Sequence, residues 1–453
     1  MGARSVQRRE QALKKFAEEC GSSIEAFGGF VIDEVSFIDM ATMGHVDDGL
    51  RMLCGVQDLL VGGMPMLLCG DNHQKPPPAG TPWFKALVQA AVGEGVESLP
   101  ALGAMSAKKR GWMLLRAVER VVLWRLMRAR GDVDFIAHQC SMRQTDAQHP
   151  VPSALIQKLR QLNHNDLAAD AAWRFATIAV LSHVERDSIN VAQLHAFARA
   201  FDLPLVRWRL PLVNDVLDPD VRQQLYEEED NLWQYFVEGA PVHLTETIKS
   251  VRKLVNGSPA LLDSLQVASN ADRSALALAY ATGFQVITLT EPPRTVNVVV
   301  GGTAAAPRLW HEVPLDDLSH LLPDYVAGEQ VVPLLASSNA EERDCLSDFA
   351  ALQGIALQQK CKVHQYNLAF ALTDYKLQGR TLPKLVLSIF LRKPPPWMTL
   401  SAFYVLVSRV RTLDSLRLLQ TDRVALRAVE ELTSDEYLHA WELGYDDATG
   451  RWS

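Results

Sequence analysis

Lys376-Leu377-Gln378-Gly379 follows an apolar run, and Ser408-Arg409-Val410-Arg411 comes about thirty residues later. A strand-to-helix corner exposes backbone N–H groups that suit anions, and a glycine lets a phosphate or a sugar approach closely. An arginine at the second corner can stabilise charge that develops on a transferred phosphoryl group. Together the two corners indicate a site for a phosphate-bearing ligand.

Two apolar segments in the N-terminal part of the chain are each followed by polar residues. Residues 30–32 lead to Asp33-Glu34, and residues 64–69 lead to Gly70-Asp71-Asn72-His73-Gln74. Apolar runs of this kind are typical of parallel sheets, whose ligands lie beyond the carboxyl ends of the strands. Residues 40–60 between them have near-helical apolar spacing. A strand-helix-strand unit of this kind can bring both polar ends to one edge of the sheet.

These four signals, in this order, resemble the Pif-one-like DNA helicases of superfamily 1, relatives of the bacterial RecD helicases. The resemblance runs from about residue 28 to 420. It implies an α/β fold with two RecA-like, P-loop NTPase domains built on parallel sheets, and a small β-rich insertion. The domains implied are the remainder of the first RecA-like domain (1–118), the first part of the second (119–240), the insertion (241–360) and the rest of the second (361–453).

The first domain of the family supplies the groups that handle water and metal. By resemblance, Asp33 would hold Mg²⁺ on the phosphates of ATP, and Glu34 would orient and deprotonate the attacking water. Gln74 would sense the γ-phosphate and pass its presence to the proline run behind it. Lys75 is a departure, because the family usually has an apolar residue before its two prolines.

The second domain supplies arginines and a glycine corner. Residues 121–124 are expected to form a strand that leads to Arg128, which would reach the nucleotide. Gln378 and Gly379 would also face the nucleotide, and Arg409 would stabilise charge on the γ-phosphate.

The same resemblance implies contacts with DNA. Thr373 and Tyr375 should face the DNA backbone, although many relatives carry His at the position of Tyr375; an aromatic ring there can still stack on a base. Lys376, Pro76 and Pro77 complete the expected DNA-contacting set. Arg411 is expected to be structural or DNA-facing.

The middle of the chain carries weaker signals. The basic segment 107–130 is expected to be mainly a solvated helix face, with a DNA track as the alternative. Residues 178–181 predict a strand, and Asp187-Ser188-Ile189-Asn190 an Asn-bearing helix start. The Leu254-Val255-Asn256-Gly257 turn resembles the family's β-rich insertion, and Asn-Gly is also a local hairpin signal. Further strands are expected at 296–300 and 330–335, and the apolar run 368–373 should be one strand.

No Gly-Lys dipeptide occurs in the sequence, so the G-x-x-x-x-G-K-[ST] phosphate loop is absent. Losing a pre-organised group that stabilises transition-state charge costs about 3 to 4 kcal/mol. Hydrolysis by this chain alone is therefore not expected, and an N-terminally truncated chain is the simplest interpretation.

Three hypotheses follow. The first is an ATP-dependent 5′-to-3′ DNA helicase that uses ATP and Mg²⁺ on single-stranded and duplex DNA, in a family linked to repair, recombination and telomere maintenance. The second is an inactive helicase-like protein that binds DNA or a partner, such as a mobile-element remnant. The third, a metal hydrolase using Asp33, Asp71 and scattered histidines, lacks any supporting ligand spacing.

Composition limits these hypotheses. A chain of 453 residues, 48% hydrophobic, can bury large cores and should form two to four domains. A net charge of −8 excludes nucleic-acid binding over the whole surface but leaves room for a local basic cleft. The six cysteines form no C-x-x-C pair. No apolar run approaches the roughly 20 residues of a membrane span. We expect a soluble monomer, nuclear or mitochondrial in a eukaryote and otherwise cytoplasmic.

Overall fold

A computed structural model describes most of the chain: residues 28–93, 105–123, 125–144, 151, 153–213, 215–248, 254–300, 330–390, 398–420 and 422–444. Trp124, the last residue of the strand expected at 121–124, lies outside these residues. The chain divides into two compact units. Unit 1 comprises residues 1–170 and 377–453, and unit 2 comprises residues 171–376.

The strand-helix-strand prediction in unit 1 is confirmed. Strands β1 (Phe30–Ile32) and β2 (Met66–Leu68) pair in parallel, with Phe30 opposite Met66. Helix α2 (Met40–Cys54) connects them. It begins where Asp39 Oδ1 accepts the N–H of Thr42 at 2.7 Å, and it ends at Gly55, whose φ of +68° a glycine adopts without strain. The carboxyl ends of both strands therefore meet at one edge.

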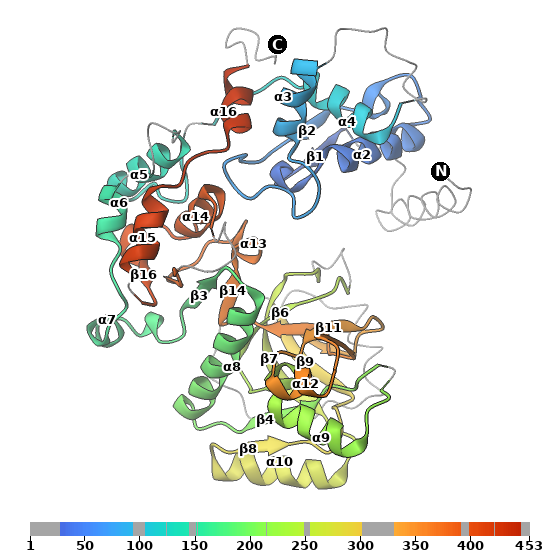
Figure 1. Ribbon diagram of the computed structural model, residues 1–453, viewed down its shortest axis with the longest axis vertical. Coiled ribbons are helices and arrows are strands. Elements are labelled where there is room, and N and C mark those ends of the chain that lie inside the picture. The colour runs from blue at the N-terminus through green and yellow to red at the C-terminus, as the bar shows by residue number, and fades with distance from the viewer. Residues whose placement is uncertain are drawn as a thin grey trace. The chain divides into compact units, whose positions relative to one another are not determined.

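Helix α4 (Ala107–Arg116) lies against α2 at very short range (Figure 1). A Cβ atom on Gly44 would come within 1.7 Å of the carbonyl oxygen of Ala107, and one on Gly111 within 2.0 Å of that of Met40. Arg110 is only 4% exposed and pairs with Asp48. Part of the basic segment expected to be solvated is therefore core, because close glycine packing draws its helix onto α2.

The remaining elements of unit 1 form a small apolar core and a layer of short helices. Trp83 and Trp441 pack edge to face, with ring centroids 4.8 Å apart. Strands β15 and β16 pair in parallel. The bounds are α3 (Trp83–Gly93), α5 (Val133–Arg143), α6 (Ser153–Lys158), α7 (His164–Ala169), β15 (Leu385–Leu387), α14 (Leu400–Val407), β16 (Leu416–Leu418), α15 (Arg423–Glu430) and α16 (Glu436–Leu443).

Unit 2 has a large apolar core around three strands. Strand β4 (Leu205–Arg209) is central, with β5 (Trp233–Phe236) antiparallel on one side and β8 (Val286–Thr288) parallel on the other. All four residues of β5 are buried. Two more strands, β3 (Thr177–Val180) and β14 (Ala371–Thr373), pair in parallel. The helices of unit 2 are α8 (His183–Ala200), α9 (Pro219–Glu228), α10 (Asn270–Thr282) and α12 (Asp348–Leu352), and α13 (Asp374–Leu377) ends at its boundary with unit 1.

An antiparallel five-stranded sheet occupies the region where the β-rich insertion was expected. Its order is β10-β9-β7-β6-β13. The Asn-Gly turn is confirmed: Gly257 has a φ of +91° and donates its N–H to the carbonyl oxygen of Leu244 at 2.8 Å. The strands are β6 (Pro241–Leu244), β7 (Pro259–Gln266), β9 (Thr295–Val300), β10 (Gln330–Leu334) and β13 (Tyr366–Leu368); a separate hairpin joins β11 (Glu341–Asp344) to β12 (Gln358–Cys361).

Three secondary-structure expectations need correction. Residues 121–123 form no strand, and Val121 and Leu123 are 83% and 82% exposed, because no described neighbour pairs with them. The β1–β2 pair is not buried on both faces, since Val31 is 68% exposed. The apolar run 368–373 is two strands, β13 and β14, because its middle residue Phe370 turns into the core.

Among the described residues, no helix is both long enough and apolar enough to cross a membrane.

Candidate nucleotide site

Asp33 and Glu34 stand at the carboxyl end of β1. The N–H of Val35 donates to the carbonyl oxygen of Cys69 at 2.9 Å, which ties this end to the end of β2. Glu34 has a φ of +54°, and holding a non-glycine residue in this left-handed region costs about 1–3 kcal/mol. Asp33 Oδ1 accepts the N–H of Glu34 at 2.8 Å. Glu34 is one of three described non-glycine residues with a positive φ, together with Val61 and Asp202.

Gln378 connects the corner of β1 to the corner after β2. Its Nε2 donates to Glu34 Oε2 at 2.8 Å, and Ser36 Oγ lies 3.4 Å from the same nitrogen. Its Oε1 accepts the backbone N–H of Lys75 at 3.2 Å. Gly379 has a φ of +76°, and a Cβ atom there would lie 3.5 Å from Glu34 Oε1. The glycine corner and the acidic corner thus form one site.

Arg409 brings a buried positive charge to this site. It is 1% exposed, and among the described residues its guanidinium donates within its own segment: Nε to the carbonyl oxygen of Val405 at 2.8 Å and Nη2 to Ser408 Oγ at 2.6 Å. Burial, with nearby Arg128 as the next cause, lowers the pKa of Arg409 to about 10. Within the described part of the chain, no carboxylate forms an ion pair with Arg409. The charges of Glu34 and Asp71 partly oppose the lowering of its pKa, and a buried guanidinium without a direct ion-pair partner favours an anionic ligand.

Arg128 lies beside Arg409. Its Nε donates to Thr381 Oγ1 at 2.8 Å, and its Nη1 donates to the carbonyl oxygen of Ser408 at 2.9 Å. Burial lowers the pKa of Arg128, while Tyr404 and Glu34 oppose this effect. Arg128 therefore reaches the predicted site even though the strand expected before it is absent.

The loop after β2 is held by side chains from distant parts of the sequence. Asp71 Oδ2 accepts the hydroxyl of Tyr404 at 3.0 Å, and Arg143 Nη2 lies 3.5 Å from Asp71 Oδ1. His73 Nε2 lies 3.1 Å from Glu442 Oε1. Gln74 Oε1 is buried and has no hydrogen-bond partner among the described residues. These contacts hold the loop in place, whereas the side-chain oxygen of Gln74, the residue predicted to sense the γ-phosphate, has no hydrogen-bond partner among the described residues.

A cavity of about 410 Å³ adjoins this loop. Gln74, Pro76 and Tyr404 contribute to its wall, and Glu431 and Asp435 line it as well. Its volume is that of a typical small-molecule site, roughly 300–1,000 Å³. Pro77, predicted to face DNA with Pro76, is buried.

The residues predicted to contact DNA just before the glycine corner lie in unit 2. Thr373 is 7% exposed at the end of β14, and Tyr375 is 36% exposed. Lys376 Nζ donates to Asn256 Oδ1 at 2.6 Å, in the Asn-Gly turn. Tyr375 therefore presents an aromatic surface to solvent, and Lys376 connects that corner to the five-stranded sheet.

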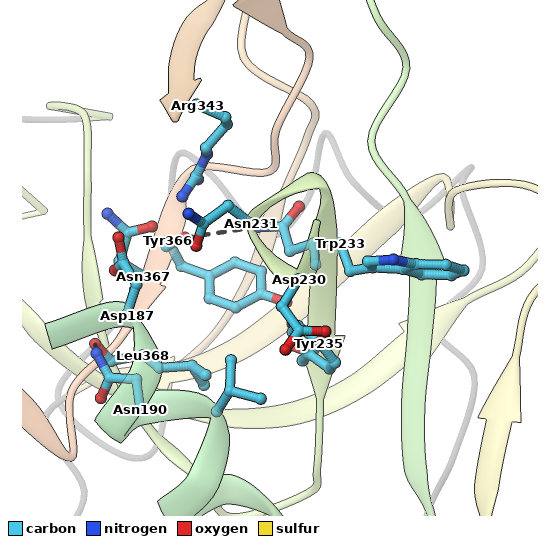
Figure 2. Close-up of a pocket in the computed structure, with 12 residues that line it drawn as sticks. Asp187, Asn190, Asp230, Asn231, Trp233, Tyr235, Arg343, Tyr366, Asn367 and Leu368 are labelled. Atoms are coloured by element: carbon cyan, nitrogen blue, oxygen red, sulfur yellow. Dashed lines mark hydrogen bonds between the residues drawn. The ribbon is translucent and has the colours of Figure 1, made fainter. Parts of the chain in front are cut away.

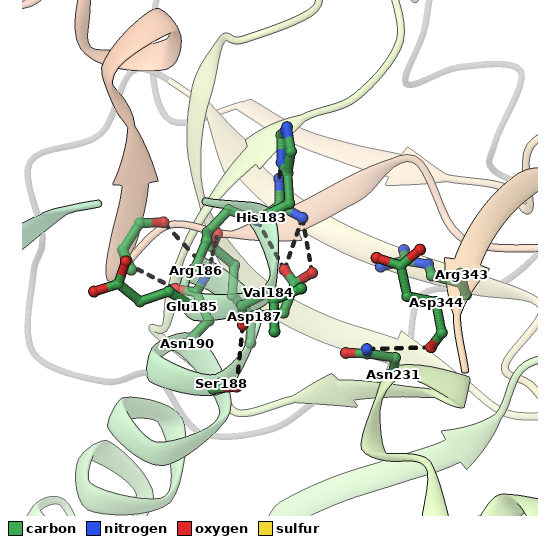
Figure 3. Close-up of polar contacts among 12 residues, drawn as sticks. His183, Val184, Glu185, Arg186, Asp187, Ser188, Asn190, Asn231, Arg343 and Asp344 are labelled. Carbon is green, nitrogen blue, oxygen red and sulfur yellow. Dashed lines mark hydrogen bonds and ion pairs between the residues drawn. The ribbon is translucent and has the colours of Figure 1, made fainter. Parts of the chain in front are cut away.

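Asn190 positions this corner from α8, which begins at His183, four residues before the helix start that the sequence predicted. Its Nδ2 donates to the carbonyl oxygens of Leu368 and Ala371 at 3.2 and 3.3 Å, and its Oδ1 accepts the N–H of Ala371 at 2.8 Å. Figure 3 shows Arg186 and Asp187 paired at the same end of α8, with Nε to Oδ1 at 2.8 Å. These contacts fix the chain just before Thr373.

A second pocket, in unit 2, is too small for a nucleotide. It lies beside β5 and β13, and Tyr366 and Asn231 are among the residues in its wall (Figure 2). Its volume is about 60 Å³, which holds a few water molecules. Tyr366 donates its hydroxyl to the carbonyl oxygen of Tyr235 at 2.7 Å, so the pocket wall is tied to β5.

The donor set of unit 1 fits phosphate groups in part. Two neighbouring arginines, Arg128 and Arg409, supply positive charge, and the exposed carboxylate of Asp33 suits a hard cation held together with phosphate oxygens. The sequence provides no lysine-bearing phosphate loop to cradle them. Among the described residues, no group of three or more His, Cys, Asp or Glu side chains could hold a metal ion.

Several functional contacts were not anticipated from the sequence. Tyr404 lies five residues before Arg409, but its bond to Asp71 depends on the tertiary fold. No sequence pattern had indicated a contact for Arg143 or Thr381. The predicted residues Asp33, Glu34, Gln74, Arg128, Gln378, Gly379 and Arg409 all belong to unit 1.

Solved structures of Pif1 helicases share the fold of this chain. The Pif1 helicase from Candida albicans is 17% identical with a TM-score of 0.51, covering 97% of this chain and 80% of that one. Bacteroides Pif1 bound to ssDNA is 14% identical with a TM-score of 0.51, covering 94% and 77%. Bacteroides Pif1 in complex with ADP-AlF3 and ssDNA is 15% identical with a TM-score of 0.52, covering 94% and 77%. No family model and no curated protein matches the sequence.

These likenesses confirm the fold expected from the sequence: a mixed α/β fold shared with the solved Pif1 helicases, with parallel strands as in RecA-like domains.

Proposed function

We propose that this chain, which has the fold of Pif1 helicases, is the motor of an ATP-dependent DNA helicase. In this proposal ATP binds with its γ-phosphate near Arg128 and Arg409. Asp33 holds Mg²⁺, and Glu34 accepts a proton from the attacking water. The sequence contains no G-x-x-x-x-G-K-[ST] phosphate loop. Hydrolysis is therefore proposed for the chain together with such a loop.

The observation that carries this proposal is the buried guanidinium of Arg409. A charge that is 1% exposed and without a carboxylate partner in the described structure is costly unless an anion binds it. The carboxylate of Glu34 lies in the same site, held by Gln378 at 2.8 Å. The site thus combines a guanidinium that can bind a phosphate with a carboxylate that can accept a proton from water, as phosphoryl transfer to water requires.

DNA is the proposed partner of both units. Two of the similar solved structures contain ssDNA, and the proposal extends this ligand to the present chain. Tyr375 would stack on a base, with Thr373 and Lys376 on the backbone, and Pro76 would contribute from unit 1, without the buried Pro77. Unwinding of duplex DNA, the 5′-to-3′ direction and the assignment of residues 241–360 to an inserted module belong to the same proposal.

A second candidate is a DNA-binding protein of this fold without hydrolysis. The observation that favours it is the absence of any Gly-Lys dipeptide from the sequence. Both candidates predict binding of single-stranded DNA, and they differ only in the reaction.

ATP hydrolysis separates the two candidates. The rate is measured with and without single-stranded DNA, for the chain alone and for the chain with a G-x-x-x-x-G-K-S strand-loop segment fused upstream. The motor proposal predicts DNA-stimulated hydrolysis in the fused chain, and a loss of about a hundredfold to a thousandfold in its Arg409→Ala variant.

Two glutamate variants complete the test. Glu34→Gln removes the proposed base and should abolish hydrolysis in the fused chain, whereas Glu228→Gln on exposed α9 should leave it intact. DNA binding without hydrolysis in the fused chain would establish the second candidate, and unchanged hydrolysis in Arg409→Ala would refute the site assignment.

A further inference from the structure

Tyr404 and Arg409 lie in one hydrogen-bonded segment, helix α14 and the turn that follows it. Helix α14 is capped by Thr399, whose Oγ1 accepts the N–H of Ala402 at 3.2 Å. The N–H of Ser408 donates to the carbonyl oxygen of Tyr404 at 3.0 Å, and Arg409 Nε donates to that of Val405 at 2.8 Å. These bonds tie Arg409 to the end of the helix that carries Tyr404.

Asp71 and Gln74 lie in a second hydrogen-bonded segment. Asp71 Oδ1 accepts the N–H of His73 at 3.1 Å, and the carbonyl oxygen of Asp71 accepts the N–H of Gln74 at 3.0 Å. Such a turn is closed by its own side chain, so the direction of Gln74 follows the placement of the Asp71 carboxylate.

One hydroxyl joins the two segments. Tyr404 is 3% exposed and donates to Asp71 Oδ2 at 3.0 Å. Burial, followed by the charge of Asp71, raises the pKa of Tyr404, so the hydroxyl stays protonated at neutral pH. Arg143 Nη2, 3.5 Å from the other carboxylate oxygen, holds Asp71 from α5.

We propose that Tyr404 is a positioning residue, whose hydroxyl couples the loop carrying Gln74 to the helix carrying Arg409. Movement of Arg409 toward a bound phosphate then changes the position of Gln74 through a single charge-assisted hydrogen bond. The proposal rests on the proposed nucleotide site, because it assigns Tyr404 a task in that site's response to its ligand.

The alternative is that the bond only satisfies a buried phenol. Buried tyrosine hydroxyls usually find a partner, and such a bond contributes to stability without any link to the ligand. The two interpretations differ in one observable: whether the loop responds to nucleotide when the hydroxyl is removed but the ring remains.

Amide hydrogen exchange of the loop around His73 and Gln74 tests the coupling in the full chain, with and without ATP. In Tyr404→Phe we expect exchange in this loop to accelerate about tenfold, since a hydrogen bond to a charged group is lost. We also expect the protection that ATP confers on the loop to disappear, while ATP affinity changes by less than about threefold.

Two further variants keep the test specific. Tyr437→Phe removes a hydroxyl from a half-buried ring that lies under Lys85 Nζ at 4.5 Å, and it should behave as wild type. Asp71→Asn combined with Tyr404→Phe should exchange no faster than the faster single variant, because both remove one shared contact.

The outcomes separate the inference from the proposed function. If ATP still protects the loop from exchange in the Tyr404→Phe variant, the proposed coupling is wrong, and the proposed nucleotide site is unaffected. A wild-type chain that binds no ATP refutes the nucleotide site, and the exchange rates without ATP then still show whether the tether exists.

Discussion

The β1–β2 corner of unit 1 and the core of unit 2 are stabilised in different ways. In unit 2 every residue of β5 is buried, and Trp208 on β4 is fully enclosed. In unit 1 the two-stranded sheet leaves Val31 and Leu67 68% and 58% exposed. Its corner is held instead by polar contacts such as the one from Gln378 to Glu34.

This difference matches the tasks of the two regions. Apolar burial gives large, non-directional stability, whereas hydrogen bonds contribute little net free energy but fix direction. A site that must respond to a ligand benefits from contacts that can exchange. The comparison predicts that substitutions in unit 2 change stability, and that those at the unit 1 corner change the response to nucleotide.

Truncation of the unit 2 core should have the largest effect on stability. Phe236 on β5 has no exposed surface, and Phe236→Ala should lower the free energy of unfolding by about 3–5 kcal/mol, because it leaves a cavity. Phe201→Ala, at a ring that is 41% exposed, is the matched control and should cost much less. Urea denaturation measures both, and equal losses would contradict the packing described for this core.

The glycine contact between α2 and α4 should be the most sensitive point of unit 1. Gly111→Ala places a methyl group within 2.0 Å of the carbonyl oxygen of Met40, so the helices must separate at a cost of about 3 kcal/mol. Gly49→Ala is the control on α2, where a methyl group meets nothing within 4 Å. There the better helix propensity of alanine should stabilise by up to about 1 kcal/mol. A neutral Gly111→Ala, measured by denaturation, would refute the close crossing.

His364 should make the stability of unit 2 depend on pH. Burial lowers its pKa to about 4, below the value of about 6.5 expected in the unfolded chain. Between these values the unfolded state binds the additional proton, so the contribution of His364 is complete above about pH 6.5 and is lost as the pH falls toward about 4.

The loss should approach about 1.4 kcal/mol per pH unit at most. Denaturation of wild type and His364→Gln across this range measures it, and only the wild type should show the additional slope. Parallel pH profiles for the two proteins would show that His364 is not buried in its neutral form.

The exposed face of the β1–β2 pair should be the least sensitive region. Val31→Thr should change the free energy of unfolding by less than about 0.5 kcal/mol, because the side chain is already in water. Val206→Thr on β4, where the side chain has no exposure, buries a hydroxyl and should cost about 1–3 kcal/mol. If the two variants lost equal stability, the contrast between the two regions would be wrong.

Local sequence signals correctly predicted the structural features that depend on neighbouring residues. The β1-α2-β2 unit followed from apolar runs and spacing, and the Asn256-Gly257 turn followed from residue type. The absence of a strand at residues 121–123 did not follow, because β-branched residues favour strands only where a partner strand exists.

The site itself was only partly predictable. Family resemblance supplied the types of group expected at Asp33, Glu34 and Arg409, but the contacts that join them cross large sequence separations. The bond from Gln378 to Glu34 links residues 344 positions apart, and the one from Tyr404 to Asp71 links residues 333 apart. No periodicity or spacing rule encodes such pairs.

Equilibrium binding of ATP to the chain tests the central claim, that unit 1 holds a site for nucleotide phosphates, most directly. Wild type is compared with Arg409→Ala, Arg128→Ala and the control Arg427→Ala, an exposed arginine on α15. The account predicts that wild type and Arg427→Ala bind alike, and that loss of Arg409 or Arg128 weakens binding by about thirtyfold or more, as expected when a buried charge pair with the ligand is lost. Equal binding by all four proteins would contradict it.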